Sequence, residues 1–96
     1  MMRPIDIEIK LKALKPVFSE RFFVQKIGYF GSYLRNEQTD KSDIDILVDF
    51  KRPVGWEFFD LKEFLEMELK TKVDLVFIKA LKEQLKEIIL KEVRYV

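Results

Sequence analysis

The sequence predicts an α/β (α+β) fold in which a small mixed β-sheet is covered by helices. Three stretches have the β-branched and aromatic content of strands, and three others carry apolar residues at helical spacing. They follow one another in the order helix, strand, strand, helix, strand, helix. A chain of 96 residues is long enough for one packed core and too short for two. We therefore expect residues 1–96 to form a single domain.

The first half of the chain is expected to contain one helix and two strands. The helix runs from about Pro4 to Phe18, and Pro16 is expected to kink or end it, because proline lacks the N–H that a helix interior uses. A strand follows over residues 24–30. The polar residues 36–42 then turn the chain into a second strand over residues 43–50, and these two strands are expected to pair antiparallel.

The second half is expected to contain two helices with a strand between them. Residues 51–55 break the second strand, and a helix with one apolar side follows over residues 56–70. A third strand is predicted over residues 72–78, alongside the first two. Apolar residues among Lys and Glu then predict a last helix between about residues 81 and 93.

Composition excludes several classes of function. Lys and Arg number 18 against 17 Asp and Glu, so the chain lacks the basic excess that grips nucleic acid, and we expect no duplex partner. The absence of Cys and His excludes disulfides, thiol nucleophiles and a Ser-His-Asp triad. Asp and Glu remain as metal ligands, and such hard oxygen ligands favour Mg²⁺ or Mn²⁺. No signal-peptide core or membrane-spanning segment is evident, so we expect a cytoplasmic protein.

Three aspartates are the candidate catalytic and metal-binding residues. Asp43 and Asp45 flank Ile44, and strand alternation places both carboxylates on one face of the sheet. The opposite face receives the apolar residues Ile44, Ile46, Val48 and Phe50. Asp74 lies inside the third strand, where burying an acidic residue would be costly without a metal or hydrogen-bond partner. Asp43 alone would be interpreted as a turn residue, so the predicted metal site depends on the three aspartates considered together.

A second element, at the end of the first strand, is a candidate phosphate-binding turn. Gly31 has no side chain to block a phosphate, and Ser32 offers a hydroxyl and a backbone N–H at the first turn of a short helix. Arg35, one turn further, would either contact a triphosphate or shape the loop by pairing with Glu37 or Asp40. We favour the phosphate contact for Arg35.

Taken together, these motifs resemble those of the minimal nucleotidyltransferases of the DNA polymerase beta superfamily. The resemblance is carried by Gly31-Ser32-Tyr33-Leu34-Arg35-Asn36-Glu37, Ser42-Asp43-Ile44-Asp45-Ile46-Leu47-Val48 and Val73-Asp74-Leu75-Val76. It implies a nucleotidyltransferase fold, Mg²⁺, and transfer of a nucleoside monophosphate, usually AMP from ATP, to an acceptor. Two Mg²⁺ ions bridged by Asp43 and Asp45 would neutralise the triphosphate, and Asp74 would orient the acceptor hydroxyl. Where the family commonly has Gly after the Arg, this chain has Asn36, which tolerates a left-handed backbone.

The resemblance also implies a partner. Many relatives are antitoxins that adenylylate a tyrosine of a HEPN-domain ribonuclease toxin, so the expected partners are a nucleoside triphosphate and a HEPN-domain protein. A homodimer is an alternative, since larger relatives carry a further helical domain and a second copy would complete the pocket. A different class of function also stays open, namely a weakly active or inactive module that neutralises its partner by binding. Polymerase activity and aminoglycoside modification are weaker alternatives.

Overall fold

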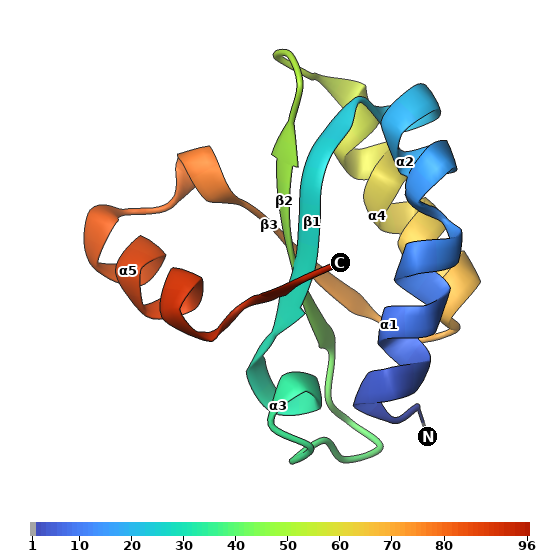
Figure 1. The fold of residues 1–96 in the computed structure, drawn as a ribbon, viewed down its shortest axis with the longest axis vertical. Coiled ribbons are helices and arrows are strands. Elements are labelled where there is room, and N and C mark those ends of the chain that lie inside the picture. The colour runs from blue at the N-terminus through green and yellow to red at the C-terminus, as the bar shows by residue number, and fades with distance from the viewer. Residues whose placement is uncertain (1) are drawn as a thin grey trace.

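The computed structural model describes residues 2–96 and shows a mixed four-stranded sheet in the order β3-β2-β1-β4 (Figure 1). The strands are β1 (Val24–Phe30), β2 (Ile44–Phe50), β3 (Val73–Phe77) and β4 (Arg94–Tyr95). β1 and β2 are antiparallel, whereas β2 and β3 are parallel and are joined through a helical crossover. The predicted fold class and the pairing of the first three strands are therefore confirmed.

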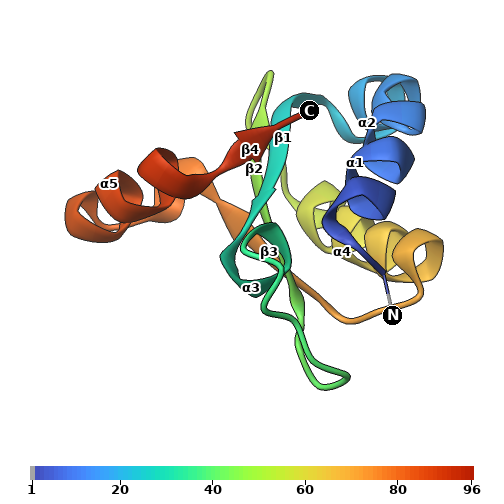
Figure 2. The same cartoon turned by 60° about the horizontal axis from the view of Figure 1, so that its bottom comes forward.

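The helices cover the two faces of this sheet unequally. Helices α1 (Pro4–Ala13), α2 (Lys15–Phe22) and α4 (Trp56–Leu69) pack on one face, whereas α5 (Glu83–Glu92) stands apart on the other side (Figures 1 and 2). No residue of α5 is buried. Two single turns complete the fold, α3 (Gly31–Leu34) directly after β1 and the 3₁₀ turn η1 (Ile78–Ala80) after β3. Among residues 2–96, none of the helices has the length and apolar character needed to cross a bilayer.

The core lies between the sheet and helices α1, α2 and α4. The apolar face predicted for β2 is confirmed, since Ile44, Ile46, Val48 and Phe50 are all buried in it. From the helices, Ile7, Leu11, Phe18, Leu61 and Leu65 are each exposed by 1% or less. Their burial supplies most of the apolar area removed from water, and it holds the strands in a register that turns Asp45 to the opposite face.

The prediction of one helix over residues 4–18 is wrong, because the chain forms two helices separated at Leu14. Pro16 cannot donate a hydrogen bond to the carbonyl of Lys12, so α1 cannot continue through it. Pro16 instead lies in the first turn of α2, where a missing N–H costs nothing. The proline therefore starts the second helix as well as ending the first.

A second difference is β4, which was not predicted. This two-residue strand pairs antiparallel with β1, with Gly28 opposite Tyr95. A Cβ atom on Gly28 would lie 2.6 Å from the Arg94 carbonyl oxygen, so only glycine allows this close approach. The last helix is also shorter than the predicted span of 81–93, because the extended residues Leu81 and Lys82 precede it and β4 follows it.

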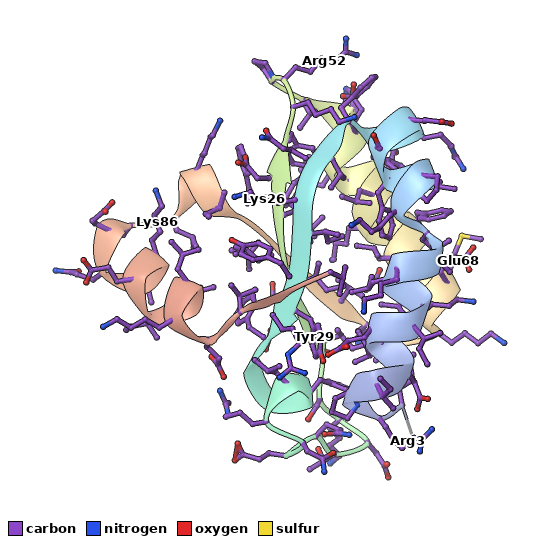
Figure 3. The ribbon with its side chains drawn as sticks, in the orientation of Figure 1. Arg3, Lys26, Tyr29, Arg52, Glu68 and Lys86 are labelled. Atoms are coloured by element: carbon purple, nitrogen blue, oxygen red, sulfur yellow. The ribbon has the colours of Figure 1, made fainter. Side chains whose placement is uncertain are left out.

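A polar contact ties the core helices to the sheet. The hydroxyl of the buried Tyr29, labelled in Figure 3, donates to Glu8 Oε1 at 2.6 Å. Arg94 Nη1 donates to the same oxygen at 2.9 Å. Burial, followed by the hydrogen bond to Glu8, raises the pKa of Tyr29 to about 12. The contact thereby connects α1, β1 and β4 through one carboxylate.

Candidate active site

Two of the predicted carboxylates are neighbours in the sheet. Asp45 of β2 and Asp74 of β3 are register partners in the parallel pair, so both side chains project from the face opposite the core. Asp45 is half-buried and Asp74 is exposed. The burial cost considered for Asp74 does not arise, because its side chain is exposed on the edge strand β3.

The electrostatics of Asp45 reflect this crowding of negative charge. Its pKa is raised from 3.8 to about 6, first by burial and then by the charges of Asp74 and Asp43. A hydrogen bond with Asp74 and the charge of Glu92 act in the same direction. Asp45 is thus the carboxylate whose ionisation a nearby cation would favour most.

Asp43 is held at the entrance to β2 by the preceding turn. Ser42 N–H donates to the Thr39 carbonyl at 3.0 Å, and Thr39 N–H donates to Ser42 Oγ at 2.9 Å. Ile44 N–H then donates to the Lys72 carbonyl at 2.9 Å, which starts the pairing with the segment that leads into β3. The side chain of Asp43 is exposed beside this junction.

Gly31 and Ser32 begin α3 directly beyond the β1 residue that pairs with Asp45. Gly31 has a left-handed φ of 75°, and a Cβ atom there would overlap Asp45 Oδ2 and lie 3.0 Å from Asp45 Cγ. The glycine therefore lets the backbone lie against the carboxylate. The first N–H groups of a helix have no partner within it, so this turn offers donors next to Asp45.

Arg35 is engaged by two glutamates. Its Nε donates to Glu37 Oε1 at 2.6 Å, and its Nη1 forms an ion pair with Glu92 of α5. The structure therefore shows the loop-shaping role through Glu37 that we had ranked second, together with a contact to α5 that was not foreseen. Asn36 adopts φ 58°, which confirms that it accepts the left-handed geometry expected of the family's glycine.

Glu92 is a site residue that the sequence prediction missed. It is the last residue of α5, it contacts Arg35, and its charge raises the pKa of Asp45, so it connects the end of α5 with the candidate site. A signal was present: Glu92 continues the helical spacing of the apolar residues Leu85 and Ile88, where the periodicity favours another apolar side chain.

Three other residues that could contact a nucleotide lie outside the site. Tyr33 is 3% exposed and belongs to the core, so it is not available to stack on a base. Trp56 is 80% exposed and packs against Phe59 near the start of α4. Asp49, on the same face as Asp45, pairs with Lys79 at 4.0 Å. A hollow of about 480 Å³ between α2, β1 and β4 includes none of the predicted site residues.

The donor set is chemically suited to a divalent cation. The raised pKa of Asp45 arises partly from the negative charge of its neighbours, which a cation would neutralise, and carboxylates are the ligands that Mg²⁺ prefers. Within residues 2–96, however, no three His, Cys, Asp or Glu side chains stand close enough together to hold a metal ion. The structure thus brings Asp45 and Asp74 together, with Asp43 beyond that pair.

Comparison with known proteins agrees with this geometry. Residues 11–96 match the family model described as nucleotidyltransferase domain. Protein adenylyltransferase MntA of Thermococcus cleftensis is 47% identical over 92 residues, which are 95% of this chain and 93% of that protein. A solved structure ascribed to a minimal nucleotidyltransferase has a TM-score of 0.84 at 29% identity, covering 97% of this chain and 95% of its own. A crystal structure of a toxin–antitoxin complex with AMP-PNP has a TM-score of 0.70 at 25% identity, covering 98% and 72%.

The fold and the paired carboxylates beside a glycine turn define a nucleotidyl-transferring enzyme. The chain belongs to the nucleotidyltransferase domain family, and the resemblance to its minimal members is confirmed.

Proposed function

We propose that this protein transfers AMP from ATP to a hydroxyl group on a protein partner, in a Mg²⁺-dependent reaction. The observation that carries the proposal is the register pair of Asp45 and Asp74, with Asp45 lying against Gly31. The relative from Thermococcus cleftensis, a protein adenylyltransferase by name, supports AMP as the transferred group and a protein as the acceptor. The toxin–antitoxin complex with AMP-PNP supports an adenine nucleotide as donor.

In this reaction the acceptor oxygen attacks the α-phosphorus of ATP. The new bond joins that oxygen to phosphorus, the bond between the α-phosphorus and the oxygen bridging to the β-phosphate breaks, and pyrophosphate leaves. Asp74, exposed at the sheet edge, would orient the hydroxyl and accept its proton. The N–H groups of Gly31 and Ser32 would hold the β- and γ-phosphates. Two Mg²⁺ ions, or Mn²⁺ in their place, would be held by Asp43, Asp45 and Asp74 and would neutralise the triphosphate.

Arg35 would contact the triphosphate after exchanging the carboxylate of Glu92 for phosphate oxygens. A guanidinium binds the two oxygens of a carboxylate and two oxygens of a phosphate with similar bidentate geometry, so one can replace the other. The exposed position of Arg35 leaves its side chain room to make that exchange.

The proposed partner is a HEPN-domain toxin, with this chain as its antitoxin. The proposal extends the resemblance of the sequence motifs, and it is supported by the toxin–antitoxin complex among the similar structures. A second copy of the chain is the alternative partner, and the exposed apolar side chains Trp56 and Phe59 are available for either contact.

Asp45→Asn tests the catalytic proposal. With α-labelled ATP, Mg²⁺ and the purified partner, we expect label transfer to fall by about a hundredfold or more, because Asn keeps the shape and removes the charge. Asp49→Asn is the matched control, since Asp49 lies on the same strand and face but pairs with Lys79. A fully active Asp45 variant would refute the proposed role of the carboxylates.

The alternative function is neutralisation by binding alone. Two observations favour it: Arg35 is occupied by Glu37 and Glu92, and no three-carboxylate group is preassembled within residues 2–96. Protection of cells separates the two functions, because an Asp45→Asn protein that still neutralises its toxin acts without transfer. Loss of protection in that variant, with binding retained, supports the enzyme.

A further inference from the structure

A hollow of about 400 Å³ lies beside Asp43, between the turn that precedes β2 and the connection from α4 to β3. Its lining includes three lysines, Lys41, Lys70 and Lys72, and two aspartates, Asp40 and Asp43. The comparisons and the proposed chemistry assign no role to these lysines. Two other hollows are also lined by three cationic side chains, and what distinguishes this one is the proposed metal ligand Asp43 in its lining.

The hollow lies where the chain enters β2 and β3, on the β3 side of the candidate site. The strand order β3-β2-β1 places the glycine turn beyond β1 and the hollow at the start of β3, so Asp45 stands between them. Lys72 precedes Val73, which pairs with Ile44, so Lys72 shares a face with Asp74 two residues further along. A molecule in the hollow would therefore lead toward Asp74, the residue proposed to orient the hydroxyl.

The lysines are available to a partner. All three are exposed, and none takes part in an ion pair among residues 2–96. Asp43 would be committed to the metal, which leaves Asp40 as the single opposing charge in the lining. The hollow is thus positively charged when the site is loaded, whereas the chain as a whole has a net charge of only +1.

Lys70 adds an independent observation. It ends α4 with φ 54°, a left-handed position that glycine and asparagine occupy far more readily. A side chain with a Cβ atom is disfavoured there, although helix α2 ends in the same conformation at Phe23, with φ 58°. The backbone conformation at Lys70 therefore carries a local cost that a glycine would remove, which separates the stability of this position from the charge of its side chain.

From these observations we propose that the hollow is an acceptor-docking subsite that binds acidic side chains flanking the target hydroxyl of the partner protein. The inference rests on the proposed transfer to a protein hydroxyl and adds the chemistry by which the acceptor is recognised. Exposed lysines select carboxylates by charge and act mainly on the encounter and its salt dependence. The specific occupant is thus an acidic surface segment of the acceptor protein.

Charge reversal tests the subsite. We expect Lys41→Glu and Lys70→Glu each to raise KM for the protein acceptor by about tenfold and to weaken its salt dependence, while KM for ATP stays unchanged. Lys62→Glu is the matched control, because Lys62 is equally exposed on α4 and does not line the hollow. Lys70→Gly separates stability from acceptor binding. We expect Tm to rise by about 3 °C, because glycine relieves the left-handed strain, and we expect acceptor binding to weaken, so that KM for the acceptor also rises.

Several results would overturn the subsite. A rise in KM for ATP would assign the lysines to the triphosphate, and an unchanged acceptor KM would leave them without a role in docking. If the wild type transfers no label, the proposed function fails. The subsite is then tested by the affinity of the chain for the purified partner protein. Direct binding of the purified partner must weaken about tenfold in the Glu variants and stay unchanged in Lys62→Glu, and any other pattern rejects acidic docking.

Discussion

Gly31→Ala is the substitution whose effect the structure defines most sharply. The φ of 75° at Gly31 is strained for any residue with a Cβ atom, and the added methyl would overlap Asp45 Oδ2. The left-handed conformation costs alanine about 1–2 kcal/mol. Turning the Asp45 carboxylate away adds about 0.5–1.5 kcal/mol for an off-rotamer side chain. We therefore expect a loss of about 1.5–3.5 kcal/mol in the free energy of unfolding.

Activity should fall by more than the loss of stability explains. The displaced carboxylate is the one proposed to hold the metal ions, so label transfer should drop by about a hundredfold or more in protein that is still folded. Urea denaturation measures the stability, and transfer of α-labelled AMP to the partner measures the activity.

Asn36→Ala is the matched control. Asn36 also has a left-handed φ, of 58°, but its side chain is exposed and does not meet Asp45. The Asn36→Ala protein should lose about 1 kcal/mol in the free energy of unfolding and keep its transfer activity. If Gly31→Ala retains full activity, or if Asn36→Ala loses as much activity as Gly31→Ala, the contact between Gly31 and Asp45 is not what the site depends on.

Two further predictions follow from the charges around Asp45. In chelator, its pKa of about 6 lies above the ordinary 3.8 because of burial and the charges of Asp74 and Asp43, so ionisation opposes folding. The free energy of unfolding should then fall as pH rises from about 4 to about 6, a decline that Asp45→Asn should lack in urea titrations. Glu92→Gln removes one partner of Arg35, so KM for ATP should fall by about two- to fivefold; an unchanged KM would show that Glu92 does not compete with the triphosphate.

Short-range patterns were sufficient to predict most of the fold. Alternation in Ile44–Phe50 identified both the buried face of β2 and the face that bears Asp45, because a strand has only two sides. The boundaries of β1 were predicted correctly, since β-branched and aromatic residues end at a glycine. The effect of Pro16 was recognised only in part, because a proline that ends one helix is equally compatible with starting the next.

The site required information from distant parts of the chain. Asp43, Asp45 and Asp74 were predicted as one set from motif spacing, but the exposure of each side chain depends on which strand forms the sheet edge. The contact of Glu92 with Arg35 joins residues far apart in sequence, and no local pattern encodes such a pairing. Strand β4 has two residues, too few to show a period, and is fixed by the close approach at Gly28.

The parallel pairing of β2 with β3 determines when the candidate site can form during synthesis and folding. A ribosome must complete α4 before Asp74 emerges, and the nascent chain must fold back over that helix before the two aspartates meet. With Asp74 in its proposed catalytic role, chains that end before β3 are expected to be inactive, and activity is expected only once β3 has joined the sheet. Since such nonlocal pairing forms late and slowly, the rate at which newly made protein gains transfer activity measures its folding.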